Sequence, residues 1–333
     1  MKTVLITGIA GLLGANFSRY LIKKGYRVVG IDDMSGGYET SVPEKAIFYR
    51  LNLNNREEVE RIFSIEKPEY VYHFAAYAAE GLSPFIRNYN YTNNILCSAN
   101  IINACINNDV KKIIFTSSMA VYGIGQPPFT EDQLPHPEDP YGIAKYAVEM
   151  DIKLAYDQFG LEYSIVRPHN VVGIYQNIWD RYRNVIGIWI RKSLNKEPLT
   201  IFGDGTQVRA FSDIGFYMEP FEKLMEHHHG ETFNIGADKY WSINDAAKAV
   251  QKIAAEFGYH VDLEYLEKRS EVHTAYCDHT KAKEYLDFKD NTNLEDTIRE
   301  MYHWALKQPN RKVEFLEYEI EKNIYSYWKK TKC

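Results

Sequence analysis

A tyrosine and a lysine, Tyr141 and Lys145, stand four residues apart in the segment P-Y-G-I-A-K. At the start of a helix this spacing puts both side chains on one face. A nearby ammonium group favours the phenolate, so it would lower the pKa of the tyrosine toward the working pH and make the phenol a usable general base. An isolated Y-x-x-x-K is usually only one face of an amphipathic helix, so this interpretation depends on its surroundings.

Two serines, Ser117 and Ser118, follow the apolar run K-I-I-F-T in the segment F-T-S-S-M-A-V-Y-G. If that run is a parallel strand, its carboxyl end lies at the edge of the sheet where such folds bind ligands. A hydroxyl at that edge can bind the reacting oxygen of a substrate and orient it toward Tyr141. The alternative is that the serines only cap the following turn.

Three glycines, Gly8, Gly11 and Gly14, occupy the segment T-G-I-A-G-L-L-G between a β-branched run and a helical pattern. At such a junction the backbone can approach a pyrophosphate closely, and the helix N-terminus stabilises its negative charge. Glycine triplets also serve turns and tight packing, but the strand-glycine-helix context favours dinucleotide binding.

Two carboxylates, Asp32 and Asp33, end the second apolar run, and Asp32 lies eighteen residues after Gly14. This is where an acidic side chain accepts hydrogen bonds from the adenosine ribose. A carboxylate repels a 2′-phosphate, and no Arg follows among residues 34–37, so the sequence predicts NAD as the cofactor. The positive nicotinamide ring would add to the effect of Lys145 on Tyr141.

The elements that must position these groups alternate along the first half of the chain, which is typical of a parallel sheet with crossover helices. The pattern predicts strands at Thr3–Thr7, Tyr26–Ile31, Tyr70–Phe74, Lys112–Thr116 and Tyr163–Val166. It predicts helices at Leu12–Lys24, Arg56–Phe63, about Ile86–Asn107, and Gly142–Phe159. We therefore expect an α/β fold with a Rossmann-type, doubly wound parallel sheet.

The alternation weakens after Arg167, where longer loops separate shorter elements such as Val185–Leu194 and Ile243–Phe257, and this indicates a smaller C-terminal lobe. We expect a cofactor domain at residues 1–170, with a returning segment near 207–237. Residues 171–206 and 238–333 would form the substrate-binding lobe. The tail from Lys312 to Lys330 mixes aromatic and charged residues, and we expect a helix there, either docked on the body or free to bind a partner.

Composition excludes several classes of protein. The formal net charge of -6 argues against a nucleic-acid partner, and the chain has no apolar stretch of the ~20 residues that span a bilayer. The four cysteines have no metal-ligand spacing and are too few to stabilise a chain of this length by disulfide bonds, which indicates a soluble cytoplasmic protein. The run His227, His228, His229 suits the end of a helix, and we expect no metal site.

Together with R-P-H-N-V-V-G, the segments described above resemble those of the extended short-chain dehydrogenase/reductase family. Within it, the chain is similar to the NAD-dependent epimerase/dehydratase group, in particular to its UDP-glucose 4-epimerase-like members. The resemblance runs from Met1 to about Phe288 and is much more specific for the superfamily than for a substrate.

The resemblance implies roles for individual residues. It makes Tyr141 the catalytic base, Lys145 its electrostatic partner and a ligand of the nicotinamide ribose, and Ser118 the catalytic hydroxyl. Beyond Tyr141 and Lys145, it implies cofactor contacts at Gly8, Gly11, Leu12, Leu13, Gly14, Asp32, Asp33, Asn52, Leu53, Phe74, Ala75, Ala76, Asn93 and Ser117. The partner it implies is a nucleotide-diphosphate sugar, bound by Ser118, Tyr141, Asn170, Asn184, Arg209 and either Lys268 or Arg269.

The chain departs from the family pattern at several positions. Met119 and Ala120 replace the Asp-Glu pair of the dehydratases, and neither can transfer a proton, which disfavours 4,6-dehydration. Asn52 replaces a common Asp, and Ala78 stands where some epimerases have a Lys that contacts the cofactor. The loop after Arg209 reads A-F-S-D-I-G-F, so Asp213, Gly215 and Phe216 replace the usual aromatic-x-Asp-Asp sequence.

Our leading hypothesis is an NAD-dependent nucleotide-sugar epimerase that transiently oxidises sugar carbon 4 and returns the hydride to the opposite face. A nucleotide-sugar 4-dehydrogenase that releases a 4-keto product is the alternative. A 4,6-dehydratase or a non-catalytic nucleotide-binding module fits the residues less well. The helical segments 86–107 and 142–159 correspond to those of a four-helix dimer interface in the family, so we expect a homodimer, although packing on the sheet would explain their apolar faces equally.

Overall fold

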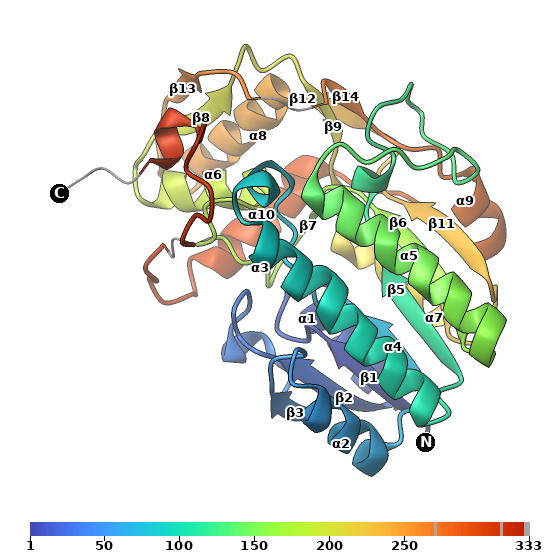
Figure 1. Cartoon of the computed structure of the whole chain (residues 1–333). Coiled ribbons are helices and arrows are strands. Elements are labelled where there is room, and N and C mark those ends of the chain that lie inside the picture. The colour runs from blue at the N-terminus through green and yellow to red at the C-terminus, as the bar shows by residue number, and fades with distance from the viewer. Residues whose placement is uncertain (270–271, 314–315, 330–333) are drawn as a thin grey trace.

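A parallel sheet of seven strands forms the centre of the molecule in the computed structural model (Figure 1), which describes residues 1–269, 272–313 and 316–329. Its strands are β1 (Thr3–Thr7), β2 (Arg27–Asp32), β3 (Ile47–Arg50), β4 (Tyr70–His73), β5 (Lys112–Thr116), β6 (Glu162–Pro168) and β11 (Glu231–Ile235). They lie in the order β11-β6-β5-β4-β1-β2-β3. The direction of winding reverses between β1 and β4, which is where doubly wound sheets bind ligands.

Helices cover both faces of this sheet, which explains why its central strands β4 and β5 are buried along their whole length. On one face, α2 (Arg56–Glu66), α4 (Cys97–Asn107) and α5 (Pro140–Phe159) share a core with Leu5 and Ile113. On the other face, α1 (Leu12–Lys23), α7 (Met218–Leu224) and α9 (Thr280–Leu286) pack around Val4 and Tyr72. The fold is thus the expected α/β fold with a Rossmann-type sheet.

The helical segment expected at about 86–107 contains a change of helix type. It consists of α3 (Arg87–Tyr91), a π-helical turn at Thr92–Leu96 and then α4. Such turns occur frequently at functional sites, because the extra residue changes the direction in which side chains project. Asn93 lies in this turn.

Two strands of the sheet, β3 and β11, were absent from the strands expected from the sequence. β3 is a four-residue edge strand whose first and last residues are exposed, and its apolar run is only three residues long. β11 begins with the exposed Glu231 and carries the polar Asn234, which Tyr122 and the carbonyl of Phe129 hold by hydrogen bonds. The formation of both strands depends on contacts with neighbouring segments more than on their own amino-acid composition.

A second group of elements has its own apolar core. It contains α6 (Val185–Leu194), α8 (Ile243–Glu256) and α10 (Leu294–Ala305), which pack against the parallel pair β8 (Leu199–Phe202) and β13 (Leu263–Leu266). The shorter elements expected at Val185–Leu194 and Ile243–Phe257 are the helices α6 and α8. Short strands connect the two groups: β7 (Val171–Val172), β9 (Val208–Ala210), β10 (Ser212–Asp213), β12 (Tyr240–Ser242) and β14 (Thr274–Ala275).

The expectation of a helix in the C-terminal tail was wrong for the part that the structure describes. Residues 316–329 contain only a 3-10 turn at Ser326–Trp328. The tail docks on the body by individual rings instead, because Tyr325 and Trp328 each pack edge-on against Phe85. The carboxylate of Glu319 also accepts hydrogen bonds from the backbone at the start of α3. Among the described residues, no helix is long and apolar enough to cross a membrane.

Candidate active site

The start of α5 holds Tyr141 in place through a dense set of hydrogen bonds. Asp139 is the N-cap, and its carboxylate accepts hydrogen bonds from the backbone N–H groups of Tyr141 at 2.8 Å and Gly142 at 2.9 Å. Pro140 occupies the first helical position, where its missing N–H costs nothing. The Asp-Pro pair is a sequence signal for this helix start that the expected boundary, Gly142, missed by two residues.

Tyr141 and Lys145 project from one face of α5, as their spacing predicted. Both are buried, with exposed fractions of 5% and 3%. The Lys145 ammonium lies 5.9 Å from the centre of the Tyr141 ring and donates a 2.8 Å hydrogen bond to the carbonyl of Thr116, the last residue of β5. This bond ties the lysine to the carboxyl edge of the sheet.

The pKa of Tyr141 corrects one expectation. Burial raises it above the ordinary value for tyrosine, and the charge of Glu80 acts in the same direction, while a hydrogen bond with Ser118 opposes them. Burial also lowers the pKa of Lys145 to about 8. The ammonium alone therefore does not make the phenol acidic, because desolvation disfavours both charged forms.

Ser118 lies next to Tyr141 because two segments approach closely. It caps the 3-10 turn Met119–Val121, and its hydroxyl accepts a 3.1 Å hydrogen bond from the N–H of Ala120. A Cβ at Gly142 would stand 2.6 Å from the Ala120 carbonyl oxygen, so only glycine lets α5 start this near the turn. Ser117 is also buried, and its hydroxyl has no hydrogen-bond partner among the residues described.

The glycine loop between β1 and α1 is packed too tightly for side chains. Gly8 has φ +70°, and a Cβ there would lie 2.8 Å from the backbone nitrogen of Ala75. A Cβ at Gly14 would lie 2.2 Å from the Gly8 carbonyl oxygen. The N-terminus of α1, with Gly11 at its cap, has no side-chain cap and can offer its N–H groups to an anion.

The acidic end of β2 is ordered by backbone contacts. Asp32 accepts hydrogen bonds from the N–H groups of Ala10 at 3.0 Å and Met34 at 2.8 Å, and burial raises its pKa. Asp33 accepts a 3.0 Å hydrogen bond from the side-chain amide of Asn52. Asn52, which replaces an acidic residue in the family pattern, therefore orients Asp33.

A pocket with a cavity volume of about 110 Å³ opens at the carboxyl ends of β1, β2 and β4. Its lining includes ten of the residues expected at the cofactor: Gly8, Gly11, Asp32, Asp33, Asn52, Leu53, Phe74, Ala75, Ala76 and Asn93. Leu12, Leu13, Gly14, Ser117, Tyr141 and Lys145 are outside this lining. Lys145 nevertheless interacts electrostatically with Cys97, a pocket residue, so the buried tyrosine-lysine pair lies close to its wall.

Arg183 also lines this pocket, although no pattern in the sequence indicated it. It comes from the loop before α6, about 150 residues after Gly36, yet one guanidinium nitrogen would lie 2.8 Å from a Cβ at Gly36. Asp180 holds the guanidinium through a 2.8 Å ion pair, and the ring of Tyr77 lies 4.7 Å from its central carbon. The fold thus places a cation beside the loop that follows Asp33.

The five residues expected at the nucleotide diphosphate fall into three places. Asn170 and Asn184 both contact the segment around β7: the carbonyl of Asn170 accepts from Ser212, and the Asn184 amide donates to Val171. Arg209, in β9, donates to the carbonyls of Val208, Val272 and His273. Lys268 and Arg269 lie farther along, beside β8, where the Arg269 guanidinium is 4.0 Å from the centre of the Phe202 ring.

The unusual loop after Arg209 has a structural explanation. Asp213 caps the 3-10 turn Ile214–Tyr217 through a 2.6 Å hydrogen bond from Gly215, and Thr297 of α10 donates to its other oxygen. Phe216 packs against the core beneath the sheet. Asp213, Gly215 and Phe216 therefore stabilise the loop through contacts with other residues of this chain.

Comparison with known proteins identifies the class to which this fold and site belong. A sequence model of the NAD dependent epimerase/dehydratase family matches residues 4–236. The chain belongs to this family, and it is an NAD-dependent enzyme.

Several of the proteins to which the chain is similar are nucleotide-sugar 4-epimerases, two of them with solved structures. A UDP-glucose 4-epimerase of Thermotoga maritima is 32% identical, with 92% of this chain and 99% of that chain covered and a TM-score of 0.86. A UDP-N-acetylglucosamine 4-epimerase of Methanobrevibacter ruminantium is 28% identical over 92% and 99% of the two chains, with a TM-score of 0.84. A UDP-glucuronate 4-epimerase of Thermodesulfobacterium geofontis is 27% identical over 92% of this chain and 96% of its own.

Proposed function

We propose that this enzyme epimerises carbon 4 of a UDP-linked sugar, with Tyr141, Lys145 and Ser118 as its catalytic residues. The observation that carries the proposal is the buried group of these three side chains at the carboxyl edge of the sheet, close to the wall of the cofactor pocket. The 4-epimerases to which the chain is similar support the choice of reaction and of UDP.

The residues of the pocket fit NAD. The crowded Gly8 loop and the uncapped N-terminus of α1 suit a pyrophosphate, and Asp32 offers a buried carboxylate where an adenosine ribose would lie. The unpartnered hydroxyl of Ser117 is available for a further polar contact. When bound, NAD supplies a hydride acceptor that takes the hydride from carbon 4 and returns it.

The chain itself moves the proton. Ser118 orients the 4-hydroxyl of the sugar, and the Tyr141 oxygen accepts its proton and later gives it back. Because burial disfavours the phenolate, Lys145 and the positive charge of the bound cofactor together must stabilise it. Met119 and Ala120 carry no transferable proton, so nothing at these positions diverts the 4-keto sugar into dehydration.

Release of a 4-keto product is the second candidate function, motivated by the changed loop after Arg209. The contacts of Asp213 and Phe216 within this chain favour the epimerase, because they account for the changed residues without a change in the sugar site. Addition of UDP-glucose, UDP-N-acetylglucosamine or UDP-glucuronate should give epimer without lasting absorbance of the reduced cofactor. One equivalent of reduced cofactor per enzyme would indicate the dehydrogenase instead.

We assign the cofactor domain to residues 1–170 with a returning segment near 207–237, and the substrate lobe to the rest, except that α9 packs on the cofactor sheet. The core formed by α6, α8 and α10 supports this division, and Asn170, Asn184 and Arg209 lie along the junction. The buried free thiols of Cys97, Cys105 and Cys277 support a location in the reducing cytoplasm.

Arg183 should hold the cofactor from the side of the substrate lobe. Ala78 stands where some epimerases have a Lys that contacts the cofactor, and Arg183 can supply a positive charge in place of that Lys. Arg183 lines the same pocket as Gly8 and Gly11. We expect Arg183→Gln to weaken NAD binding about tenfold or more, since a hydrogen bond to a charged group contributes ~1.5–3 kcal/mol. Calorimetric titration of cofactor-free protein with NAD measures this.

The control for Arg183 is Arg181→Gln, in the same loop. Arg181 donates to the carbonyl of Tyr327 in the tail and is not part of the pocket lining. We expect its NAD affinity to match that of the unchanged protein. Equal affinities for the two variants would show that Arg183 serves only to pair with Asp180.

The exposed faces of α4 and α5 should join two copies of the chain. Ile143, Met150 and Leu154 are 43%, 45% and 54% exposed at helical spacing on α5, and Leu96, which directly precedes α4, is 51% exposed. The two helices pack side by side on one face of the molecule (Figure 1). We propose that this surface forms the homodimer.

A charge in this surface should separate the dimer. We expect Leu154→Glu to give the mass of one chain in light scattering at about 10 µM, because a carboxylate cannot be buried there unpaired. Ile65→Glu on α2, at a site that is 56% exposed, is the control and should remain dimeric. A single-chain mass for the unchanged protein would refute the dimer.

A further inference from the structure

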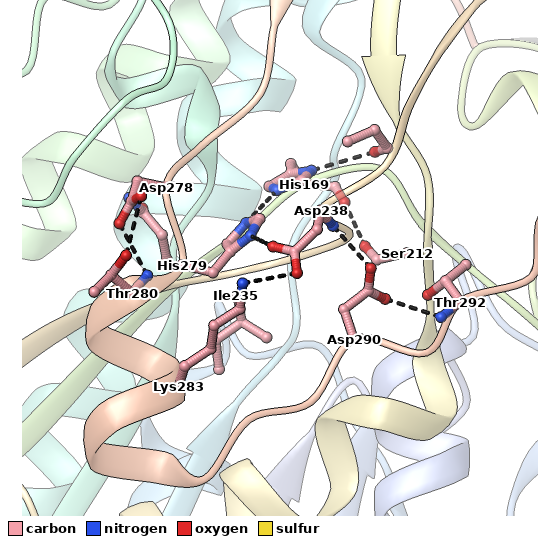
Figure 2. Close-up of polar contacts among 12 residues, drawn as sticks. His169, Ser212, Ile235, Asp238, Asp278, His279, Thr280, Lys283, Asp290 and Thr292 are labelled. Atoms are coloured by element: carbon pink, nitrogen blue, oxygen red, sulfur yellow. Dashed lines mark hydrogen bonds and ion pairs between the residues drawn. The ribbon is translucent and has the colours of Figure 1, made fainter.

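Two buried histidines meet where β6, β9 and α9 come together. His169 directly follows β6 and His279 directly precedes α9, and each is 2% exposed. Their Nε2 atoms are 2.8 Å apart (Figure 2). The Nδ1 atom of His169 is 3.2 Å from the carbonyl oxygen of Ala210, and that of His279 is 3.0 Å from a carboxylate oxygen of Asp238.

This chain of contacts requires a definite number of protons. The carbonyl at one end and the carboxylate at the other are acceptors, so both Nδ1 atoms must carry hydrogen. Two nitrogens 2.8 Å apart need a hydrogen between them, because two lone pairs facing each other would repel. The four ring nitrogens therefore hold three hydrogens, one more than two neutral imidazoles have.

The charged groups around the pair act in both directions, because Asp238 and Asp278 favour protonation of His279 and Lys283 opposes it. Asp238 stays ionised: burial alone would raise its pKa, but hydrogen bonds from Lys283 and His279 lower it. Lys283 pairs with its second oxygen at 2.7 Å, and Asp278 adds a further negative charge near His279. Asp290 accepts a 2.8 Å hydrogen bond from the backbone of Asp238 and fixes its position (Figure 2).

The surrounding backbone is shaped for the His169 ring. A Cβ at Gly236 would lie 2.0 Å from the Nε2 atom of His169, so only glycine at this position leaves room for the imidazole ring. On the other side, the hydroxyl of Ser212 donates a 2.8 Å hydrogen bond to the carbonyl of His169.

The pair lies between two residues of the proposed nucleotide site. Asn170 directly follows His169, and Arg209 directly precedes Ala210, whose carbonyl accepts the hydrogen bond from His169. We propose that His169 and His279 share one bridging proton and carry one positive charge between them, and that this imidazole pair positions Asn170 and Arg209. The positioning role, but not the shared proton, rests on the proposed function.

The pair should be sensitive to pH. Burial lowers the pKa of His169 to about 3, and the charge of its neighbour lowers it too, so the bridging proton lies closer to the Nε2 atom of His279. Burial lowers the pKa of His279 as well, against the opposing effect of Asp238. The bridge is therefore present at low pH and is lost as the pH rises through the lowered pKa of His279, somewhat below the ordinary histidine value of about 6.5.

NMR of the unchanged protein with 15N-labelled histidine tests the bridge without any substitution. At the acidic end of a titration from pH 8 downward, we expect one slowly exchanging imidazole proton that correlates with the Nε2 atoms of both His169 and His279. It should disappear as the pH rises to about 8. Absence of this proton across the whole range would overturn the proposal, whatever reaction the enzyme catalyses.

Binding of UDP tests the positioning role, independently of turnover. His169→Phe should fill the site without a hydrogen bond, and its dissociation constant for UDP should rise about tenfold, as for loss of one hydrogen bond. His169→Asn can keep the donor to Ala210, so it should recover part of the affinity. Both variants should lose the pH dependence by which UDP binds the unchanged protein more weakly at pH 8 than at pH 5.

The control is His260→Phe, at an exposed position beyond α8. It should bind UDP as the unchanged protein does, with the same pH dependence. If His169→Phe behaves like this control, the pair does not position the nucleotide site. If UDP binding changes as expected but no sugar is turned over, the imidazole pair stands and the proposed reaction is wrong.

Discussion

Tyr141→Phe should lower turnover by about a thousandfold while the protein keeps its fold and its NAD. Loss of a positioned general base typically costs a factor of ~10²–10⁴. The ring remains to fill the buried site at the start of α5, and the backbone contacts of Tyr141 with Asp139 do not involve the phenol oxygen. Initial rates with a UDP-sugar, together with the NAD content of the purified variant, measure the effect.

Tyr156→Phe is the matched control on the same helix. Tyr156 is 41% exposed and its ring contacts Tyr163, far along α5 from the start of the helix. Its turnover should equal that of the unchanged enzyme. If Tyr141→Phe kept more than about a tenth of the activity, another group would have to be the base.

Gly8→Ala should remove the bound cofactor and destabilise the protein. An alanine at φ +70° costs roughly 1–2 kcal/mol from backbone strain alone. Its methyl group would also lie 2.8 Å from the backbone nitrogen of Ala75, so β1 and β4 would have to separate at the floor of the pocket. We expect NAD to be absent from the purified variant and the thermal midpoint to fall.

Gly25→Ala separates these two causes. Gly25 has φ +89°, but no atom lies within 4 Å of the position of its Cβ. This variant should therefore show only the strain of about 1–2 kcal/mol and should retain its NAD. Equal losses of stability in the two variants, with NAD retained in both, would mean that crowding against Ala75 does not shape the cofactor site.

The sequence predicts most of the sheet and the catalytic group because their signals are local. Five strands are short apolar runs, and Tyr141 and Lys145 share a helix face by spacing alone. The pKa of Tyr141 could not be predicted in the same way. Spacing puts the ammonium near the phenol, but the degree of burial, which raises the pKa, depends on how α5 packs against the turn after Ser118.

Contacts between distant segments carry no such signal. Arg183 reaches the loop after Asp33 from about 150 residues away, and His169 meets His279 across 110 residues. In each case the identity of the residue is ordinary and only the fold gives it a neighbour. The wrong expectation of a helix in the aromatic tail has a related cause. The tail is held by contacts with Phe85 and the start of α3, which its own sequence does not reveal.

Transfer of deuterium from carbon 4 tests the central claim most directly. A UDP-sugar that carries deuterium only at carbon 4 should be converted to its 4-epimer, with the deuterium still on carbon 4 of the product. Retention is expected because the hydride leaves and returns within one closed site, whereas the proton that Tyr141 moves exchanges with water. Loss of the deuterium to solvent, or a label that remains on released cofactor beside a 4-keto product, would contradict the account.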